Sequence, residues 1–135
     1  GYILILEGIL TSMLVILSRN YGMTERADNS NVVLLAAIEY INQHFMEKLT
    51  ISDISRHLFY SEASINRVFK PQTGLSFKQY LTMVRIRNAR MLLRDTDTDI
   101  TMVAIESGYD NYSAFYRAFM KQMQMSPNDY RKQYR

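Results

Sequence analysis

The sequence contains no cysteine and no tryptophan, and it has only two prolines and five glycines among 135 residues. Without cysteine, the chain forms no disulfide, no thiolate nucleophile and no zinc finger. The glycines stand apart from one another, so a glycine-rich phosphate loop is also missing. His44 and His57 are too few for a histidine-based metal site or catalytic dyad. We therefore expect no enzyme activity, no metal and no cofactor.

The charge is distributed unevenly along the chain. Residues 1–31 carry a net charge of −1, residues 32–95 carry +4 and residues 96–135 carry 0. A basic middle segment favours a polyanionic partner, most simply nucleic acid. A solvated basic face without a partner explains the same charge. Charge alone does not separate these two interpretations.

The stretch Tyr2–Leu17 is almost wholly apolar. It is too short and too interrupted for a membrane span, and it lacks the features of a secretory signal. Apolar residues recur at steps of three and four, which predicts a helix with a dimerisation seam. An ordinary core helix explains the pattern equally well, because two heptads are too few to establish a coiled coil. The seam consists of Ile3, Leu6, Leu10, Met13 and Leu17.

Helical patterns dominate the rest of the chain. Residues 21–31 are polar and predict a linker. Residues 32–46 follow as one helix, with an inner face of Leu35, Ile38, Ile41 and Phe45. A long helix is expected over 76–94, and residues 95–99 form a polar break. Sustained strand alternation is missing, so the sequence predicts an all-α fold.

The chain contains a repeat. Ile51, Ser52, Ile54 and Ser55 align with Ile100, Thr101, Val103 and Ala104 at an offset of 49 residues. At an offset of 50, Ile65, Arg67, Phe69, Ser76 and Tyr80 align with Phe115, Arg117, Phe119, Ser126 and Tyr130. The change of offset places one extra residue in the turn of the second copy. Two copies of one small helical unit are therefore predicted.

Each copy has the sequence features of a helix-turn-helix. A hydroxyl, Ser52 or Thr101, is expected to cap a short helix, and small residues at Ser55 and Ala104 permit two helices to cross closely. The turn contains Phe59-Tyr60 in the first copy and Gly108-Tyr109 in the second. Ser61, and either Asp110 or Asn111, then cap a second helix that is free to enter a DNA major groove.

The outward positions of the second helices carry side chains suited to reading bases. Arginine can bind guanine in bidentate fashion and asparagine can do the same with adenine, while alanine packs against the thymine methyl group. A single exposed arginine more often braces its own helix through acidic neighbours, but Arg67 and Arg117 occupy equivalent positions in both copies. The predicted base-reading residues are Ala63, Ser64, Asn66, Arg67, Tyr112, Ser113, Tyr116 and Arg117.

Residues 32–135 resemble the DNA-binding domain of the AraC/XylS family of bacterial transcription regulators. The second copy carries the most specific part: Ala104, Gly108-Tyr109, Phe115, Arg117, Phe119 and Ser126-Pro127-x-x-Tyr130-Arg131. The resemblance implies two helix-turn-helix subdomains, 32–75 and 96–135, joined by a linker helix at 76–95. It also implies a regulator, mostly an activator, that contacts RNA polymerase. Residues 1–20 would be the end of an upstream regulatory or dimerisation domain.

The chain departs from the family pattern at three places. Gln124 stands where glycine is usual, so a left-handed residue there is strained by about 1 kcal/mol. Pro71 stands where lysine is common and is expected to end the first recognition helix early. Ala63 and Ala114 are small where bulkier or polar residues occur, so no relative supplies the base sequence that is read.

Three classes of function follow. The leading hypothesis is a sequence-specific regulator that binds double-stranded DNA in the cytoplasm, in association with the nucleoid and not with a membrane. Its phosphate contacts are predicted to be Lys70, Lys78, Arg85, Arg87, Lys121, Arg131 and Lys132. An alternative is a helical interaction module that forms homodimers through residues 1–20. DNA-repair methyltransferases carry a similar DNA-binding module, but they need a reactive cysteine that this chain lacks.

Overall fold

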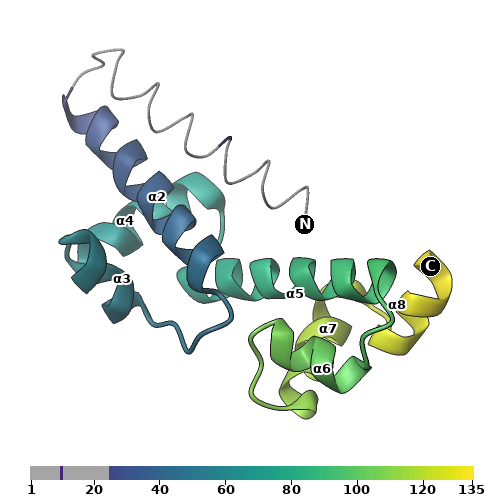
Figure 1. The fold of residues 1–135 in the computed structure, drawn as a ribbon. Coiled ribbons are helices and arrows are strands. Elements are labelled where there is room, and N and C mark those ends of the chain that lie inside the picture. Colours follow the sequence, from purple (N-terminus) through teal and green to yellow (C-terminus); the bar gives the residue numbers. More distant parts are fainter. Residues whose placement is uncertain (1–9, 11–24) are drawn as a thin grey trace. The chain divides into compact units, whose positions relative to one another are not determined.

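A computed structural model describes Leu10 and residues 25–135, and all of the regular structure in this part of the chain is helical (Figure 1). The all-α prediction is confirmed. Of the predicted N-terminal seam, only Leu10 falls within the described residues, where it is 56% exposed. The helices are α2 (Glu25–His44), α3 (Ile51–Leu58), α4 (Glu62–Thr73), α5 (Phe77–Asp95), α6 (Ile100–Glu106), α7 (Tyr112–Met123) and α8 (Pro127–Tyr134).

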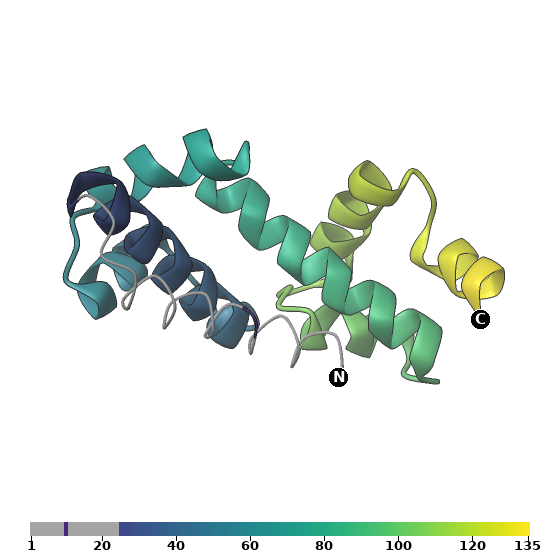
Figure 2. The same cartoon turned by 90° about the horizontal axis from the view of Figure 1, so that it is seen from above.

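The described residues form two compact units. The first contains α2 and residues Leu49–Phe77, and therefore α3 and α4. The second contains Lys78–Arg135 together with the short segment Phe45–Lys48. The predicted linker helix is observed as α5, which runs without a break (Figure 2). All of α5 after its first residue belongs to the second unit, so the helix is part of that unit's core and more than a spacer.

Helix α2 begins earlier than the sequence pattern indicated. We expected a linker at 21–31 and a helix from Val32, but α2 begins at Glu25, so the linker prediction is wrong for residues 25–31. Glu, Arg and Ala favour helix and allow a polar extension before the packed part. Of the expected inner face, Ile41 and Phe45 are buried, as predicted. Leu35 and Ile38 are only half-buried, and Val33, Leu34 and Ala37 complete the buried face of α2 instead.

The caps of the two short first helices lie two residues earlier than expected. Thr50 caps α3 in a capping box, in which its backbone N–H donates to Asp53 Oδ2 at 2.8 Å. That hydrogen bond is the main reason why the pKa of Asp53 is lowered. Asp99 caps α6 by accepting from the Thr101 backbone N–H at 3.1 Å. Ser52 and Thr101 therefore lie inside the helices, and Ser52 donates to Glu62 instead.

The caps of the two recognition helices agree with the sequence. Ser61 Oγ accepts from the Ser64 backbone N–H at 3.1 Å at the start of α4. Asn111 Oδ1 accepts from the Ala114 backbone N–H at 2.8 Å at the start of α7, which decides between the two candidates there. Because a cap satisfies an otherwise unpaired donor, these residues define where each recognition helix begins.

Pro71 does not end α4, so that prediction is wrong. The helix continues to Thr73, and the carbonyls near its end are satisfied in other ways. The Gly74 N–H donates to the Lys70 carbonyl at 2.8 Å, and Thr73 Oγ1 donates to the Phe69 carbonyl at 2.7 Å. Proline costs most in a helix interior, and here only two residues of helix follow it.

Each unit has a core built from the repeated apolar positions. In the first, Ile54, Ile65 and Phe69 are fully or almost fully buried. In the second, Val103, Phe115 and Phe119 occupy the equivalent positions and are fully buried. Tyr130 of α8 packs edge-on against Phe119, with ring centroids 5.6 Å apart. The core of the second unit also includes Ile86, Ala89, Leu93 and Ala104.

The left-handed residue at the end of α7 gives a stability prediction. Gln124 has φ +57°, where the equivalent Gly74 has φ +74°. We expect Gln124→Gly to raise the free energy of unfolding by about 0.5–1 kcal/mol, because glycine adopts this conformation without steric cost. The same substitution at Gln122, inside α7, should lower it by about 1 kcal/mol. Urea denaturation followed by circular dichroism measures both, and a loss of stability in Gln124→Gly would contradict the argument.

Candidate nucleic-acid interface

Helix α4 presents a polar outer face in the first unit. Ala63, Asn66 and Arg67 are exposed, and Ser64 is half-buried at its edge. A guanidinium nitrogen of Arg67 donates to Ser64 Oγ at 3.2 Å, and Ser64 Oγ lies 2.8 Å from Ser61 Oγ. The hydrogen bond to a neutral hydroxyl holds the arginine along the helix without neutralising its charge. Arg67 therefore keeps the donors and the charge that a guanine edge requires.

Helix α7 presents the equivalent face in the second unit with larger side chains. Ser113 and Arg117 are exposed, and the rings of Tyr112 and Tyr116 are 39% and 36% exposed. The two tyrosine rings lie 5.8 Å apart, and Tyr112 also contacts the buried ring of Phe115 at 6.3 Å. These contacts order the rings on the helix surface. The faces of α4 and α7 therefore differ in shape and chemistry, so they suit different base sequences.

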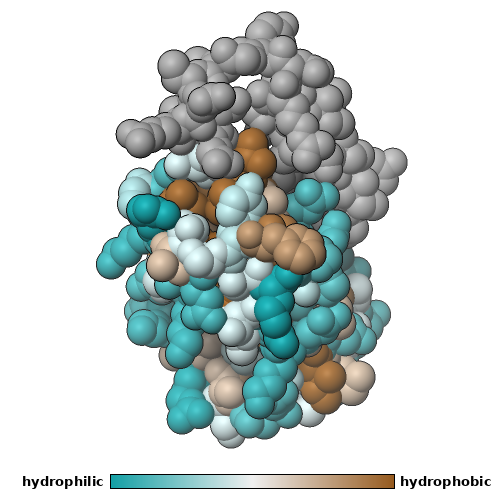
Figure 3. All heavy atoms as spheres, turned by 90° about the vertical axis from the view of Figure 1, so that its left-hand side faces the viewer, coloured by the Kyte–Doolittle hydropathy of each residue, from teal (hydrophilic) through white to brown (hydrophobic). Residues whose placement is uncertain are grey.

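The exterior around the first unit is mainly hydrophilic. Most described residues on the face over α2, α3 and α4 are polar, and hydrophobic groups are scattered among them (Figure 3). Phe59 is exceptional, because its side chain is 94% exposed and its φ is +58° at the end of α3. The sequence placed Phe59 in the turn but gave no signal of its exposure. Its aligned partner in the second copy is Gly108, where a positive φ is ordinary.

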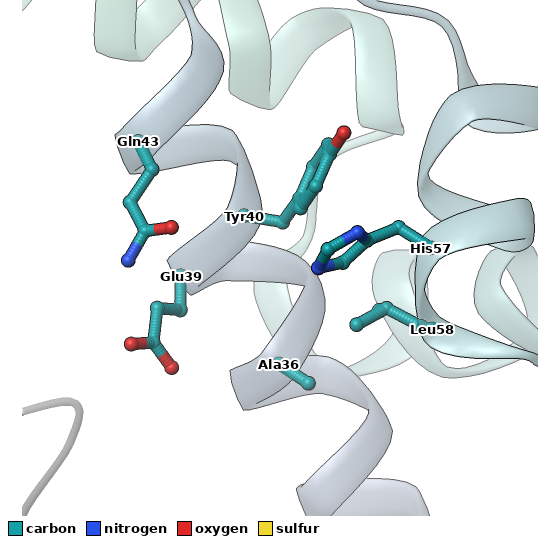
Figure 4. Close-up of a pocket in the computed structure, with 6 residues that line it drawn as sticks. All are labelled: Ala36, Glu39, Tyr40, Gln43, His57 and Leu58. Atoms are coloured by element: carbon teal, nitrogen blue, oxygen red, sulfur yellow. The ribbon is translucent and has the colours of Figure 1, made fainter.

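A hollow in the first unit lies beside α2. It is lined by Ala36, Glu39, Tyr40, Gln43, His57 and Leu58, with a volume of about 240 Å³. The Tyr40 and His57 rings face each other at 4.5 Å, while Glu39 and Gln43 point away from them (Figure 4). His44 stacks on Tyr40 at 4.2 Å. Both histidines thus pack on one tyrosine, and no cluster of metal-ligating residues is found in the described part of the chain.

Four of the seven predicted phosphate contacts are available for that role. Lys70, Lys78, Lys121 and Lys132 are exposed. Lys70 follows the outer face of α4, and Lys121 follows that of α7, so both continue the surfaces that carry the base-reading candidates. The three arginines of the set are at least half-buried.

Arg85, a predicted phosphate contact, is bound to backbone carbonyls in this structure, which competes with that role. Its Nε donates to the Phe45 carbonyl at 2.8 Å, and a terminal nitrogen donates to the Glu47 carbonyl at 2.9 Å. The guanidinium also lies over the Tyr109 ring, 5.6 Å from its centroid. Burial lowers the pKa of Arg85 and raises that of Tyr109. Arg85 thus ties Phe45–Lys48 to the turn of the second helix-turn-helix.

Arg131, also a predicted phosphate contact, is bound to backbone carbonyls in the same way. Its guanidinium donates to the carbonyls of Leu93, Thr96 and Thr98 at 3.1, 3.3 and 2.6 Å. These carbonyls lie at the end of α5 and in the turn that follows, where a cation also complements the helix dipole. The side chain therefore fixes α8 to α5 and is not displayed to a ligand. Arg87 is half-buried on α5, which likewise disfavours a phosphate contact.

A contact that the sequence did not reveal surrounds Gly108. The glycine has φ +95°, and a Cβ built on it would lie 2.5 Å from the Phe45 carbonyl oxygen. The Gly108-Tyr109 pair indicated an unusual turn, but Phe45, which packs against Gly108, lies more than sixty positions earlier in the sequence. Close approach and left-handed backbone together leave room only for glycine.

A family described as a helix-turn-helix domain matches residues 54–133, which include most of α3, all of α4 to α7 and nearly all of α8. The HTH-type transcriptional activator RhaS of Klebsiella pneumoniae is 30% identical over 124 residues. The chain belongs to the AraC/XylS family.

Other AraC/XylS relatives agree with this membership. The melibiose operon regulatory protein of Escherichia coli is 37% identical over 93 residues, which are 69% of this chain and 31% of that protein. The alignment with RhaS covers 92% of this chain and 45% of RhaS. This AraC/XylS chain thus spans less than half the length of the curated relatives that it matches.

Solved structures of the AraC/XylS type share the fold. The C-terminal domain of AraT, a response regulator from Geobacillus stearothermophilus, superposes with a TM-score of 0.72 at 35% identity, covering 75% of this chain and 84% of that one. The DNA-binding domain of AdpA, solved in complex with a target DNA, superposes with a TM-score of 0.69 at 26% identity, covering 73% and 89%. Within the described residues, no helix is both long and apolar enough for a membrane span.

Proposed function

We propose that the chain is the sequence-specific DNA-binding part of a transcription regulator, with α4 and α7 as its two recognition helices. The observation that carries the proposal is the pair Arg67 and Arg117, both exposed at equivalent positions of the two helices. The relatives support it, because RhaS is named a transcriptional activator and AdpA was solved on its target DNA. The two helices would read successive major grooves about one helical turn apart, roughly 10 bp.

The roles of the exposed residues follow from their chemistry. Arg67 and Arg117 would bind guanine edges, and Asn66 an adenine edge. Ser64, Ser113 and the two tyrosine hydroxyls would bind phosphates or base edges, and Ala63 would pack on a thymine methyl group. Lys70, Lys78, Lys121 and Lys132 would contact phosphates. No catalytic activity and no cofactor are part of the proposal.

Selection of binding sites from a random duplex pool, followed by a salt titration on the selected duplex, tests the proposal. We expect two short motifs about 10 bp apart, because each recognition helix reads its own groove. The selected duplex should bind at least about a thousandfold more tightly than an unrelated duplex of equal length. Failure of any motif to become enriched, with weak binding that depends only on salt, would contradict sequence-specific recognition.

Two partners are proposed beyond DNA. The apolar spacing over Ile3–Leu17 supports a homodimer through residues 1–20, or a second function as a helical interaction module. Sedimentation of the chain with and without residues 1–20 tests this, and monomers in both at micromolar concentration would exclude self-association through these residues. An activating regulator would also contact RNA polymerase, and RhaS is named a transcriptional activator. Function on chromosomal DNA places the protein in the cytoplasm at the nucleoid.

A further inference from the structure

A polar cleft lies between α5 and α7 within the second unit. It has a volume of about 310 Å³ and is lined by Lys78, Gln79, Thr82, Ala118, Lys121 and Gln122. Lys78 and Lys121 are exposed and bring two ammonium groups, and Thr82 brings a hydroxyl. Among the described residues that line the cleft, none carries a carboxylate. Two cations with hydroxyl and amide donors are the chemistry that recognises an oxyanion such as a phosphate.

The cleft borders the base-reading face of α7. Successive residues of a helix are turned by about 100°, so Lys121 lies one turn beyond Arg117 and about 40° around the helix from it. Ala118, the next residue after Arg117, forms part of the cleft wall. The base-reading face of α7 therefore continues around the helix into the cleft, on the side where α5 packs.

The dimensions of DNA determine what lies beside such a face. A helix with side chains is about 10–12 Å across and nearly fills a major groove about 12 Å wide. When Arg117 points at the base edges, side chains on either flank of α7 face the phosphates along the groove edges. The α5 flank is the one that holds Lys121 and, across the cleft, Lys78 and Thr82.

We propose that this cleft binds the DNA backbone at the α5-side edge of the groove read by α7. Lys78 and Lys121 supply the charge, and the Thr82 hydroxyl donates a hydrogen bond to a phosphate oxygen. The proposal rests on the proposed function. It adds Thr82 to the DNA contacts and specifies that the DNA backbone lies on the α5 side of α7. Binding here sets the register of α7 in its groove and carries no base preference of its own.

Three substitutions in the otherwise unchanged chain test the cleft: Lys78→Gln, Lys121→Gln and Thr82→Val. Dissociation constants are measured over a salt series on the selected duplex and on an unrelated one. Each lysine variant should weaken binding to both duplexes by the same factor, about 5- to 10-fold. It should also reduce the slope of log affinity against log salt concentration by about 1. Thr82→Val should weaken binding several-fold with an unchanged slope, because it removes a hydrogen bond and no charge.

Lys48→Gln is the matched control. It removes the same charge from an exposed residue of the second unit that lies outside the cleft and off both recognition helices. A slope change in Lys48→Gln equal to that of the cleft variants would overturn the proposal, as would a loss confined to the selected duplex. Cleft variants that bind DNA like wild type would overturn it too and assign the cleft to an acidic protein partner. Wild-type protein that binds no duplex would overturn the proposed function itself.

Discussion

Gly108→Ala is expected to lower the free energy of unfolding by about 3–5 kcal/mol. The added Cβ would lie 2.5 Å from the Phe45 carbonyl oxygen, 2.8 Å from Arg85 Nε and 3.2 Å from Met46 Cα. Two of these atoms belong to the backbone, and the third belongs to a guanidinium held by two hydrogen bonds. None of them moves away without breaking a contact, so steric overlap adds to the strain of φ +95°.

Gly74→Ala is the matched control for the steric part of this effect. Gly74 also has a positive φ, +74°, but nothing lies within 4 Å of a Cβ built there. Its substitution should cost only the backbone strain, about 1 kcal/mol. Urea denaturation followed by circular dichroism compares the two variants. Equal losses of unfolding free energy in the two variants would contradict the prediction. They would mean that the packing of Phe45 against Gly108 does not limit the space for a Cβ.

Arg117→Ala should weaken binding of the selected duplex by about 1–3 kcal/mol, or roughly 5- to 150-fold. Binding of an unrelated duplex should change little, because no base is read there. A repeated site selection should show one relaxed base position in the motif read by α7. Since Arg117 is exposed, the midpoint of urea denaturation should stay at the wild-type value.

Arg117→Lys separates charge from geometry at the same position. Lysine keeps the positive charge but cannot form the planar bidentate pair that guanidinium makes with guanine. The variant should retain the wild-type salt slope and still lose discrimination at that base. If Arg117→Ala instead weakens both duplexes equally and reduces the slope by about 1, Arg117 contacts a phosphate and does not read a base.

The sequence predicted the parts of the fold that depend on local pattern. Periodicity identified the helices, and the internal repeat paired Ile65 with Phe115 and Phe69 with Phe119, all of which are buried. Ser61 and Asn111 were found because a cap is chosen by a short polar side chain close to the helix that it starts. The exposure of Arg67 and Arg117 followed from the same periodicity. Local rules thus located the exposed faces of α4 and α7.

The errors arose where distant parts of the chain meet or where local rules compete. Arg85 and Arg131 look like any basic residue in the sequence, but their acceptors lie 33–40 positions away. The caps of α3 and α6 were misplaced because several hydroxyl and carboxyl residues stand close together there. Pro71 was judged as a helix breaker, although it stands in the last turn, where only two residues of α4 follow it. The cleft between α5 and α7 joins residues about forty positions apart, so sequence alone could not assemble it.

The segment Phe45–Lys48 also has a consequence for how this protein can be divided. In the chain it connects α2 to α3, yet by its packing it belongs with α5–α8. The two compact units are therefore not consecutive blocks of sequence. A cut after residue 77 would separate Arg85 from both of its carbonyl acceptors. It would also expose the surface of the second unit at Gly108 that Phe45 and Met46 cover. Exchange of the second unit between relatives should succeed only when Phe45–Lys48 is transferred together with Lys78–Arg135.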